Sequence, residues 1–460
     1  MPQTPQPPVA APRAPTHEPG TLGRPQACQV AIVGAGLTGL SSAHALAREG
    51  VDFRVFERQG HVGGHAITLE EAGYRFDRTG HLLHLRDPAV RQDVLTWIGA
   101  DHVEVTRNSV VYSHGTYTRY PYQANTFGLP PAVANECLLG FIQAHFRKDK
   151  PETKTFEEFC RAHFGDGISD HFMIPYNSRL WGVHPREITA EWCQRFVPLP
   201  KLEDVVAGAV GLNDRELGYN TRFVYPRLGI GALPQGMLDA LPRASERVLL
   251  NQRLERVDAQ RRSLHFADGH SCDYQRLIST APLDVLLGLL ELPGDVRRAA
   301  DLLRCSHLYY LDVASTSPCG KDIHWVYVPE AQYPYYRVGC YSHFSAAMAP
   351  PGCSGYYVEL ASREPPDLDQ LLPEVYAGLT EMGLLPDPSA VAFTRLRRID
   401  HAYVIFDHNY YQALATIRPF LDSLGIISAG RYGDWNYSSM EDALLFGRKA
   451  ANDATAGLCG

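Results

Sequence analysis

Three glycines and one carboxylate near the start of the chain form a pattern that could bind a phosphate-bearing cofactor. Gly34, Gly36 and Gly39 read GxGxxG, and Glu57 follows 18 residues after the last of them. In such a turn the first glycine allows a tight bend, the second lets a pyrophosphate approach the backbone, and the third lets a helix pack on a strand. A carboxylate at this distance can accept hydrogen bonds from a ribose diol. The pattern therefore predicts a dinucleotide site.

The neighbouring residues predict the elements that must position this turn. Gln29 to Val33 is a short apolar run typical of a strand, residues 40–49 show a helical pattern, and residues 51–56 indicate a second strand. The N-terminus of the helix would present unpaired N–H groups to the phosphates. Residues 425–430 read as strand then turn, and a helix is expected from about 438 to 451. The nucleotide-binding unit is thus predicted to combine the start of the chain, residues around 245–285 and the end.

A second glycine pair favours FAD over NAD. Gly63 and Gly64 lie just beyond the acidic end of the second strand, after Arg58. In many flavoproteins such a pair lets the chain pass close to the pyrophosphate of the cofactor. The alternative that these residues leave open is a flexible loop.

Composition excludes several classes of function. The chain has 460 residues and a formal charge of -8, which argues against sequence-independent binding of nucleic acid. Its apolar stretches fall short of the roughly 18–20 residues that span a bilayer. The ten cysteines form no CxxC pair and no metal-like spacing. Reduced thiols in a cytoplasmic protein and no metal site are therefore the expectation.

The pattern along the chain predicts an α/β fold of the two-dinucleotide-binding-domain class, with a Rossmann-type FAD domain, an inserted helical domain and an antiparallel β-sheet domain. The first 27 residues hold eight prolines and are expected to be a disordered extension. The expected segments are the FAD-binding parts 28–100, 211–290 and 401–460, a β-sheet substrate segment 101–128, a helical substrate domain 129–210 and an antiparallel sheet domain 291–400.

Several longer stretches resemble one known family, the UDP-galactopyranose mutases, and in particular their eukaryotic-type branch. The likeness runs through most of residues 28–455 and includes rare residue types in order. The matching stretches are Gly80-His81, Tyr120 to Gln123, Phe172 to Trp181, Gln194 to Val197, Tyr219-Asn220, Trp325 to Tyr327, Tyr335 to Arg337, Asp400 to Tyr403 and Gly430 to Tyr437.

The resemblance implies an isomerase that interconverts the pyranose and furanose forms of a nucleoside-diphosphate sugar, UDP-galactopyranose or a close relative. Members of this family act through an adduct between the sugar and N5 of reduced flavin, so the cofactor provides the nucleophile. The implied cofactor is FAD, active when reduced, with NAD(P)H as a reductant that the sequence leaves open. The sequence also leaves open whether the protein assembles into a homo-oligomer. The implied substrate partner is the nucleotide sugar.

The resemblance also assigns roles to individual residues. Arg195 and Arg337 would bind the diphosphate through planar guanidinium groups, and His81 would follow the redox state of the flavin; these three are the predicted catalytic residues. The predicted FAD-binding residues are Gly34, Gly36, Leu37, Thr38, Gly39, Glu57, Arg58, Gly63, Gly64, His81, Leu254, Gly430, Arg431 and Met440. The predicted substrate-binding residues are Tyr120, Tyr122, Gln123, Asn177, Trp181, Arg195, Asn220, Tyr327, Arg337, Tyr403 and Tyr437.

Three departures from the family bear on its substrate. A glycine-rich run is reduced to residues 227–231, a tyrosine is replaced by Phe344, and an asparagine near the flavin by Glu441. Loss of one phenol removes a hydrogen bond of roughly 0.5–1.5 kcal/mol, which is too little to abolish binding. Two alternatives share the fold: an FAD oxidoreductase of the amine-oxidase or protoporphyrinogen-oxidase type, and a flavin-bound protein without catalysis.

Overall fold

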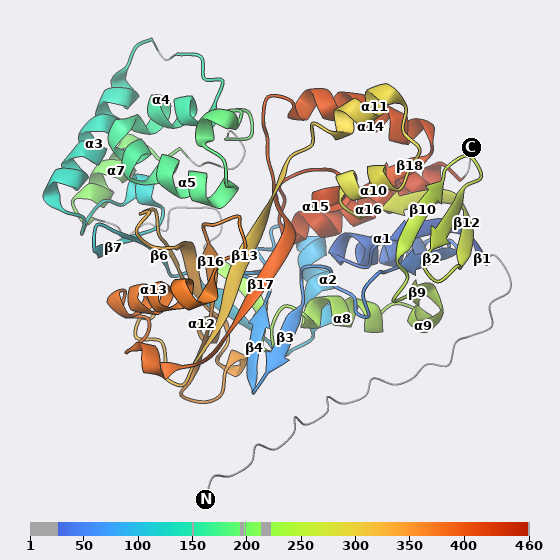
Figure 1. Cartoon of the computed structure of the whole chain (residues 1–460), viewed down its shortest axis with the longest axis horizontal. Helices are drawn as coiled ribbons and strands as arrows, with labels where there is room; N and C mark the ends of the chain where they lie inside the picture. Colours follow the sequence, from blue (N-terminus) through green and yellow to red (C-terminus); the bar gives the residue numbers. More distant parts are fainter. Residues whose placement is uncertain (1–25, 150, 194–196, 198, 213–221, 459–460) are drawn as a thin grey trace, which may run out of the picture.

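A seven-stranded sheet in one half of the molecule joins three distant parts of the chain (Figure 1). The structure is a computed structural model that describes residues 26–149, 151–193, 197, 199–212 and 222–458. The strand order is β10-β11-β12-β1-β2-β9 with β18 beside β12, and β18, β12, β1, β2 and β9 run parallel. The strands are β1 (Gln26–Val33), β2 (Phe53–Phe56), β9 (Val248–Leu249), β10 (Leu254–Asp258), β11 (Ser263–Phe266), β12 (Ser271–Ser279) and β18 (Ile426–Ser428).

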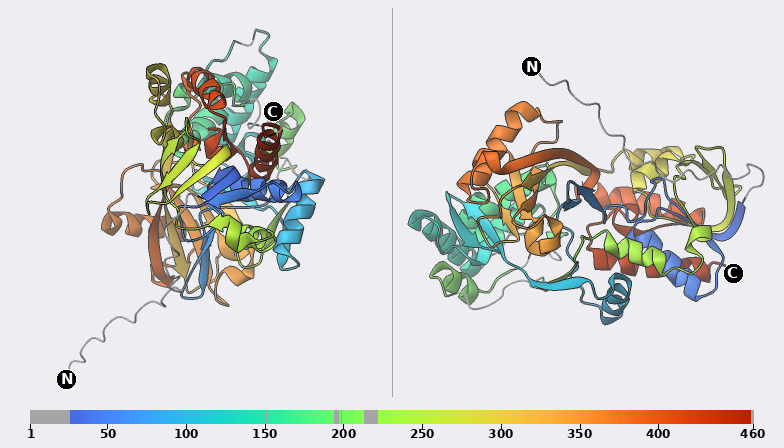
Figure 2. Two further views of the ribbon diagram at one scale, coloured as in Figure 1. Left: turned by 90° about the vertical axis from the view of Figure 1, so that its right-hand side faces the viewer. Right: turned by 90° about the horizontal axis from the view of Figure 1, so that it is seen from below.

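Both faces of this sheet are buried because successive side chains of a strand point to opposite sides. Val30 and Ile32 pack in one cluster with Leu40 and Leu444, whereas Ala31 belongs to the core on the other face. The helices that carry Leu40 and Leu444, α1 and α16, lie side by side (Figure 2). The helices of this half are α1 (Leu37–Arg48), α2 (Pro88–Ile98), α8 (Ala232–Asp239), α9 (Ala244–Arg247), α10 (Leu283–Gly288), α11 (Gly294–Ala300), α14 (Tyr410–Ser423), α15 (Gly430–Gly433) and α16 (Met440–Ala456).

The strand, helix and strand predicted around the glycine turn are confirmed as β1, α1 and β2. The helix begins at Leu37, earlier than its apolar pattern indicated, because Gly36 already accepts the first backbone hydrogen bond, from Leu40 at 2.9 Å. The last predicted helix is α16. It begins at Met440 because Ser439 and Asp442 form a capping box, in which each side chain accepts the other residue's backbone N–H.

A second seven-stranded sheet occupies the other half, in the order β17-β13-β16-β15-β14-β6-β7. Its neighbours are antiparallel except β14 and β6, which run parallel. Helix α13 packs on one face, where Val338 and Val326 meet Val375 and Leu379. The elements are β6 (Ser109–Ser113), β7 (Thr116–Arg119), β13 (Cys305–Ser315), β14 (Trp325–Tyr327), β15 (Tyr335–Cys340), α12 (Tyr341–Phe344), β16 (Ser354–Leu360), α13 (Leu368–Glu381) and β17 (Val391–Val404).

Four of the helices that the structure describes form a separate lobe beside the second sheet (Figure 1). They are α3 (Pro131–Phe146), α4 (Phe156–Ile168), α5 (Ile174–Trp181) and α7 (Leu202–Ala209), with a one-turn π-helix at Ser169–Met173 and 3-10 turns at Tyr122–Ala124 and Pro185–Glu187. The mainly helical character predicted for this stretch is confirmed. Its core is aromatic: Phe141, Phe156, Phe159, Phe164 and Phe172 are all buried. The sequence-predicted α/β fold, with its helical and antiparallel parts, is therefore correct.

A buried carboxylate joins two small two-stranded sheets between these halves. The sheets are β3 (Thr68–Glu71) with β4 (Tyr74–Asp77), and β5 (His102–Thr106) with β8 (Arg222–Pro226). Asp77 accepts hydrogen bonds from Tyr225 Oη at 2.5 Å, Thr68 Oγ1 at 2.6 Å and the Ile230 N–H at 3.1 Å. It thereby anchors residues 227–231, the shortened glycine run. Gly229, in that run, has a φ of +102°, and a side chain there would overlap Thr68 Oγ1.

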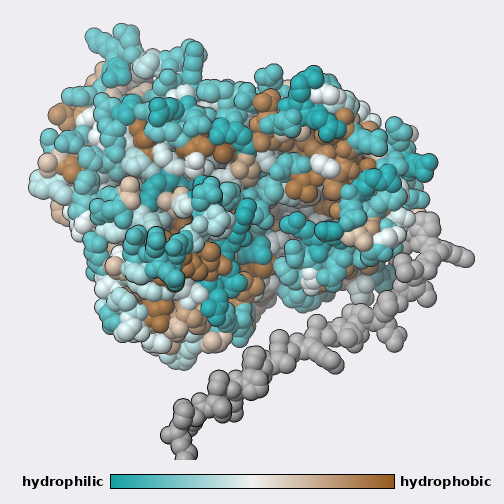
Figure 3. All heavy atoms as spheres, viewed as in Figure 1, coloured by the Kyte–Doolittle hydropathy of each residue, from teal (hydrophilic) through white to brown (hydrophobic). Residues whose placement is uncertain are grey.

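Hydrophilic residues predominate on the face of the molecule seen in Figure 3, with hydrophobic residues in smaller patches. Among the helices that the structure describes, all are too short or too polar to cross a membrane. Large aromatic side chains lie inside instead, and Tyr335, Tyr336, Tyr341 and Tyr356 are fully buried.

The packing around Asp77 predicts an unusual cost for one glycine substitution. Gly229→Ala should lower the free energy of unfolding by at least about 1 kcal/mol more than Gly269→Ala, because overpacking adds about 1–3 kcal/mol to the strain of a positive φ. Gly269 is the matched control: its φ is +82° and a side chain there would meet nothing within 4 Å. Urea unfolding of both variants measures the difference, and equal midpoints would contradict the packing argument.

Candidate functional site

The turn between β1 and α1 is shaped to receive a group at Gly36. A side chain at Gly39 would overlap the carbonyl oxygen of Gly34, so Gly39 serves the packing of helix on strand. A Cβ at Gly36 would instead lie 3.9 Å from the Cα of Gly64, the nearest atom of the protein. The protein itself therefore does not require glycine at position 36. The open space over this helix N-terminus fits a pyrophosphate that approaches the backbone.

Glu57 is held beside this turn by two backbone N–H groups. Its Oε2 accepts from Ala35 at 2.8 Å and its Oε1 accepts from Gln59 at 2.8 Å, and the side chain is buried. Each carboxylate oxygen retains a further lone pair that can accept from a ribose hydroxyl. The backbone N–H of Gln252 donates to the carbonyl of Glu57 at 2.7 Å. That contact brings the start of β10 next to Glu57 at the end of β2. The predicted residue Leu254 is the first residue of β10 and is partly buried.

The second glycine pair runs alongside the first turn. The Gly63 N–H donates to the Ala35 carbonyl at 2.8 Å, and Gly36 and Gly63 form a parallel bridge. Arg58, before this loop, is exposed. The two glycine segments therefore form opposing walls of one cradle, with backbone rather than side chains facing the space between them. This geometry fits the pyrophosphate of FAD.

The end of the chain closes the cradle from a third direction. Gly430, with a φ of +90°, lies so close to Thr38 that a Cβ would sit 2.7 Å from Thr38 Oγ1. Met440 is the first residue of α16 and packs against the core of the first sheet. Glu441 is buried in the first turn and accepts from the backbone N–H groups of Arg86 and Asp87, the latter at 2.8 Å. This departure from the family thus holds a neighbouring loop.

Two partly buried histidines, His65 and His81, lie near one another at the end of this region. Burial lowers the pKa of His81 to about 4, and burial together with the Arg78 charge lowers the pKa of His65 to about 3. Among the residues that the structure describes, His81 Nδ1 has no hydrogen-bond partner although it is buried. His81 is therefore neutral near pH 7, and one ring nitrogen is available to a bound group.

Arg337, which is partly buried, forms an ion pair with a fully buried carboxylate across two strands of the second sheet. Its Nη2 donates to Glu359 Oε1 at 2.6 Å and to Tyr403 Oη at 3.2 Å. Glu359 is fully buried, and Arg337 and Glu359 are direct cross-strand partners in β15 and β16. Within the described part of the chain, Arg337 Nε, Glu359 Oε2 and Tyr336 Oη are buried without a hydrogen-bond partner. Such groups are costly unless a polar ligand pairs with them.

An aromatic wall surrounds this arginine. The rings of Tyr403 and Tyr437 are stacked with centroids 6.3 Å apart, and Trp181 lies edge-on to Tyr403 at 5.4 Å. The guanidinium of Arg431 lies over the Tyr437 ring at 4.7 Å and over the Tyr403 ring at 5.7 Å. Arg431 Nη1 donates to the Ser438 carbonyl at 2.6 Å, which fixes its direction. Two cations and three aromatic rings therefore share one surface.

A second aromatic group continues from this wall to the helical lobe. Tyr120 stacks on Tyr327 with ring centroids 4.5 Å apart, and Tyr176 lies edge-on to Tyr327 at 5.3 Å. Tyr327 is the cross-strand neighbour of Arg337 in β14 and β15. The predicted base-binding Tyr122 is fully buried, by contrast, and stacks on Phe172 at 4.9 Å.

Of the remaining predicted substrate residues, some are buried and others lie outside the residues that the structure describes. Gln123 and Asn177 are buried, and Asn177 Nδ2 donates to the Met173 carbonyl at 2.7 Å, one turn before Trp181 on α5. Arg195 and Asn220 lie outside the described residues. Of the predicted set, the structure thus gathers Arg337, Tyr403, Tyr437, Tyr327 and Tyr120 on one connected surface, and the fully buried Trp181 packs behind it.

Sequence analysis did not predict two of the residues that belong to this group. Glu359 pairs with Arg337, and the buried Tyr176 lies between Tyr327 and Tyr336, its ring 6.0 Å from that of Tyr336. The usable signal for Glu359 was a charged residue in β16, where all seven residues are buried. A charge in such a strand requires a partner. For Tyr176 the sequence carried no signal beyond its place in the motif that ends at Trp181.

Comparison with known proteins bears on the fold and on the cofactor. The family described as flavin containing amine oxidoreductase matches residues 37–455. The crystal structure of reduced UDP-galactopyranose mutase has a TM-score of 0.87 and 28% identity, covering 94% of this chain and 96% of the mutase. Putrescine oxidase bound to putrescine has a TM-score of 0.65 and 17% identity, covering 94% of this chain and 100% of the oxidase. A fatty acid isomerase from P. acnes has a TM-score of 0.62 and 15% identity, covering 92% of this chain and 97% of the isomerase.

The last two similarities show the fold alone at these identities. By sequence, 4,4'-diapophytoene desaturase from Staphylococcus aureus is 32% identical over 87 residues, which are 18% of this chain and 17% of the desaturase. The match therefore spans less than a fifth of the length of that relative.

The glycine geometry predicts a variant that folds but binds FAD poorly. Gly36→Ala adds a methyl group into the open space of the cradle without striking the protein, so it should reduce FAD affinity about ten- to a hundredfold. Its circular dichroism should stay like that of the unaltered protein. Gly39→Ala is the contrasting variant, since its methyl group overlaps Gly34 and should destabilise the fold itself. Reconstitution of the apoprotein with FAD measures the effect, and unchanged affinity in Gly36→Ala would refute the placement of the pyrophosphate.

Proposed function

The chain belongs to the flavin containing amine oxidoreductase family, and from this premise we propose that it is a mutase of the UDP-galactopyranose mutase type, in the eukaryotic-type branch. It would interconvert the pyranose and furanose forms of a nucleoside-diphosphate sugar. The observation that carries the proposal is the partly buried Arg337, with a buried and unpartnered Nε, inside a wall of tyrosines next to the FAD cradle. The 28% identity and near-complete coverage of the mutase support it.

Arg337 supplies the chemistry that a diphosphate leaving group needs. Its guanidinium already has Nη2 committed to Glu359 and Tyr403, which orients the plane of the group. The remaining N–H groups, Nε included, can donate to phosphate oxygens as a fork. Negative charge grows on the diphosphate as its bond to the sugar breaks, so this attraction is stronger in the transition state. Arg195 is proposed as the second diphosphate ligand from its motif alone.

The aromatic wall would hold the sugar and exclude water. Burial raises the pKa of the Tyr403 phenol to about 12, so it remains a neutral hydrogen-bond donor at any physiological pH. Tyr437 and Trp181 cover it from two sides. A dry, neutral surface with phenol donors protects a reactive sugar intermediate from hydrolysis. Tyr120 and Gln123 are proposed for the nucleobase, and the buried position of Tyr122 gives it a supporting role behind them.

The cradle residues would hold FAD, with the pyrophosphate at Gly36 and Gly63 and the ribose at Glu57. When bound and reduced, the flavin would supply the nucleophile for the anomeric carbon. Neutral His81 can donate or accept one hydrogen bond toward that cofactor, so its expected role is hydrogen bonding rather than a charge change near pH 7. NAD(P)H is proposed as the reductant.

The second candidate is an oxidase of the amine-oxidase type, which the family match and the putrescine oxidase fold both accommodate. The two proposals differ in what they ask of Arg337. An amine oxidase substrate has no diphosphate, so a partly buried cation with an unpaired N–H would repel an ammonium group rather than bind it. This electrostatic argument favours the mutase.

One experiment separates the two candidates. Dithionite-reduced protein is incubated with UDP-galactopyranose and other nucleotide sugars, and the products are resolved by chromatography. The mutase predicts a furanose product without oxygen uptake. Oxygen consumption with putrescine and no change in any nucleotide sugar would instead establish the oxidase.

The same mechanism predicts that turnover requires reduced flavin although the reaction is redox-neutral. Protein reduced with dithionite should isomerise the nucleotide sugar, and air-oxidised protein should show only a background rate. Product formation in anaerobic and aerobic reactions, followed with the flavin spectrum, measures this. Equal rates from both forms would contradict a nucleophilic role for the reduced cofactor.

Arg337 is predicted to bind UDP as well as the intact sugar nucleotide. Arg337→Lys keeps a cation for Glu359 but loses the planar fork, and Arg337→Ala removes both. A charge-assisted hydrogen bond contributes about 1.5–3 kcal/mol, so Arg337→Ala should weaken UDP binding about ten- to a hundredfold. Arg337→Lys should recover part of this, and kcat should fall further than affinity in both. Fluorescence titration with UDP and steady-state kinetics give the two numbers.

The control for this series is Arg398→Ala. Arg398 lies on β17 of the same sheet and pairs with Asp400 in an exposed ion pair at 2.8 Å, so its loss removes an equal charge away from the wall. UDP affinity should be unchanged in this variant. Arg337→Ala leaves Glu359 buried without its cation, so flavin content and the unfolding midpoint are recorded for each protein. UDP affinity unchanged in well-folded Arg337→Ala would eliminate the diphosphate assignment.

A further inference from the structure

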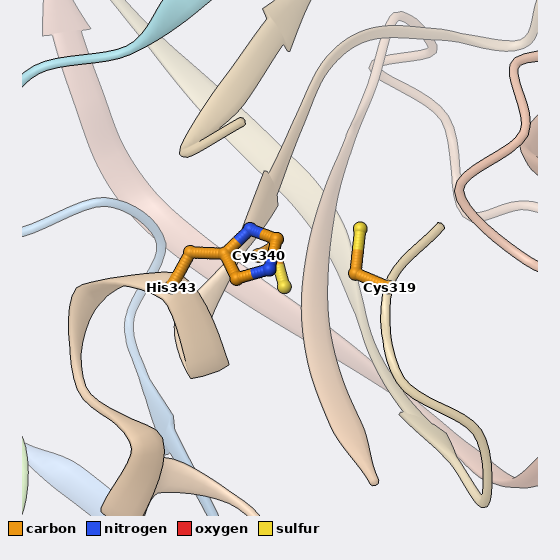
Figure 4. Close-up of side chains that lie close together, drawn as sticks. All are labelled: Cys319, Cys340 and His343. Atoms are coloured by element: carbon orange, nitrogen blue, oxygen red, sulfur yellow. The ribbon is translucent and has the colours of Figure 1, made fainter. Parts of the chain in front are cut away.

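Two cysteines and a histidine meet on the face of the second sheet opposite Arg337 (Figure 4). Cys319, Cys340 and His343 each offer one ligand atom, and these atoms lie within 4.8 Å of one another. The sequence spacing predicted no metal-like cluster, because 20 residues lie between the two cysteines. The fold brings them together across a loop and a strand end.

Cys340 is placed by the alternation of β15. Val338 and Cys340 point into the cluster that packs under α13, whereas Arg337 points to the other face toward Glu359. The Cys340 N–H donates to the His324 carbonyl at 2.9 Å, which ties the end of β15 to the loop before β14. The thiol is therefore buried in a fixed position, separate from the aromatic wall.

Cys319 is held opposite by the loop that leads into β14. The neighbouring Gly320 N–H donates to the Leu384 carbonyl at 3.2 Å, and the Ile323 N–H donates to the Lys321 carbonyl at 3.0 Å. The side chain of Cys319 is only partly buried. In Figure 4 its sulfur projects from this loop on the far side of the Cys340 sulfur from the imidazole. Solvent ions can therefore reach the group from the Cys319 side.

His343 shows the hydrogen bond that orients a metal-ligating imidazole. Its Nδ1 lies 2.7 Å from the Ile323 carbonyl, an acceptor, so Nδ1 carries the proton. Nε2 then holds the free lone pair. Metal-bound histidines in proteins characteristically donate their other ring N–H to a carbonyl or carboxylate in this way. The carbonyl belongs to the same loop as Cys319, so one segment positions two of the three ligands.

We propose that Cys319, Cys340 and His343 form a binding site for a zinc-class divalent cation. Thiolate and imidazole are the ligands that Zn²⁺ prefers, at about 2.3 Å from sulfur and about 2.0 Å from nitrogen. Ligand atoms of a zinc tetrahedron lie about 3.5–3.8 Å apart. Small side-chain rotations that move the three ligand atoms by about 1 Å or less would therefore complete the site. Both thiols would release their protons to solvent on binding. Within the described residues the group has these three protein ligands, so water or an anion would take the fourth position.

The bound ion would link the loop at 319–323 to the end of β15. That hairpin, β14 with β15, carries Tyr327 and Arg337 on its other face. Binding would therefore stabilise the strands that present the aromatic wall without contacting the wall itself. The site is independent of which reaction the flavin performs.

The test uses the full chain carrying FAD, freed of metal with a chelator and kept reduced. Co²⁺ is titrated as a spectroscopic probe and then displaced by Zn²⁺. We expect about one Co²⁺ per chain, with a thiolate-to-cobalt charge-transfer band that Zn²⁺ abolishes, and a Zn²⁺-dependent rise in the unfolding midpoint. Cys319→Ser should lose the band and the rise, and His343→Gln should weaken Co²⁺ binding at least about tenfold.

Cys353→Ser is the matched control, since Cys353 is also a partly buried free thiol in the same half of the molecule. It should retain the band and the rise in midpoint. Flavin content reports folding of each variant, and His343→Gln decides the matter by the same readouts should Cys319→Ser lose its flavin. A band that survives in Cys319→Ser, no bound cobalt in the unaltered protein, or a Cys319–Cys340 disulfide that persists under reductant would each overturn the proposal.

Discussion

The ion pair between the partly buried Arg337 and the fully buried Glu359 is the constraint on which the arrangement of the aromatic wall depends. Glu359 is fully buried, and a carboxylate in that position is tolerated only with a cation and hydrogen bonds around it. The two residues are cross-strand partners, so the pair requires β15 and β16 to meet in one register. That register also sets Tyr327 beside Arg337 on β14. One electrostatic requirement thus determines which side chains face the FAD half of the molecule.

The two halves of the site are joined by a single dipeptide. Gly430 lies against Thr38 in the FAD cradle, and the next residue, Arg431, lies over the rings of Tyr403 and Tyr437. The positive φ of Gly430 turns the chain sharply at this point. Arg431 also donates to the carbonyl oxygens of Ser438 and Ala402, which belong to segments far apart in the sequence. Two adjacent residues therefore contact both the glycine turn and the aromatic wall.

The charged and the neutral side chains of the shared surface have different roles. Arg337 and Arg431 retain their charges because neighbouring carboxylate, carbonyl and aromatic groups stabilise them. His81 and Tyr403 are instead neutral, since burial lowers the pKa of the imidazole to about 4 and raises that of the phenol to about 12. The cations that we propose for the diphosphate thus lie beside neutral groups that can form hydrogen bonds without adding charge. This combination suits a substrate that is anionic at one end and uncharged at the sugar.

The sequence by itself determined those elements that depend on interactions between residues close together in the chain. The glycine turn, the strand and helix around it, the acidic strand end and the helix that begins after Ser439 follow from backbone sterics, capping and periodicity, which act over a few residues. Only the tertiary structure decided which side chains meet. It paired Arg337 with Glu359, placed Tyr120 on the aromatic surface but Tyr122 in the core, and brought Cys340 to Cys319 and His343. Strand register and the facing of alternate residues are set by pairing between segments far apart in the chain, and no pattern within a segment encodes the partner that it will meet.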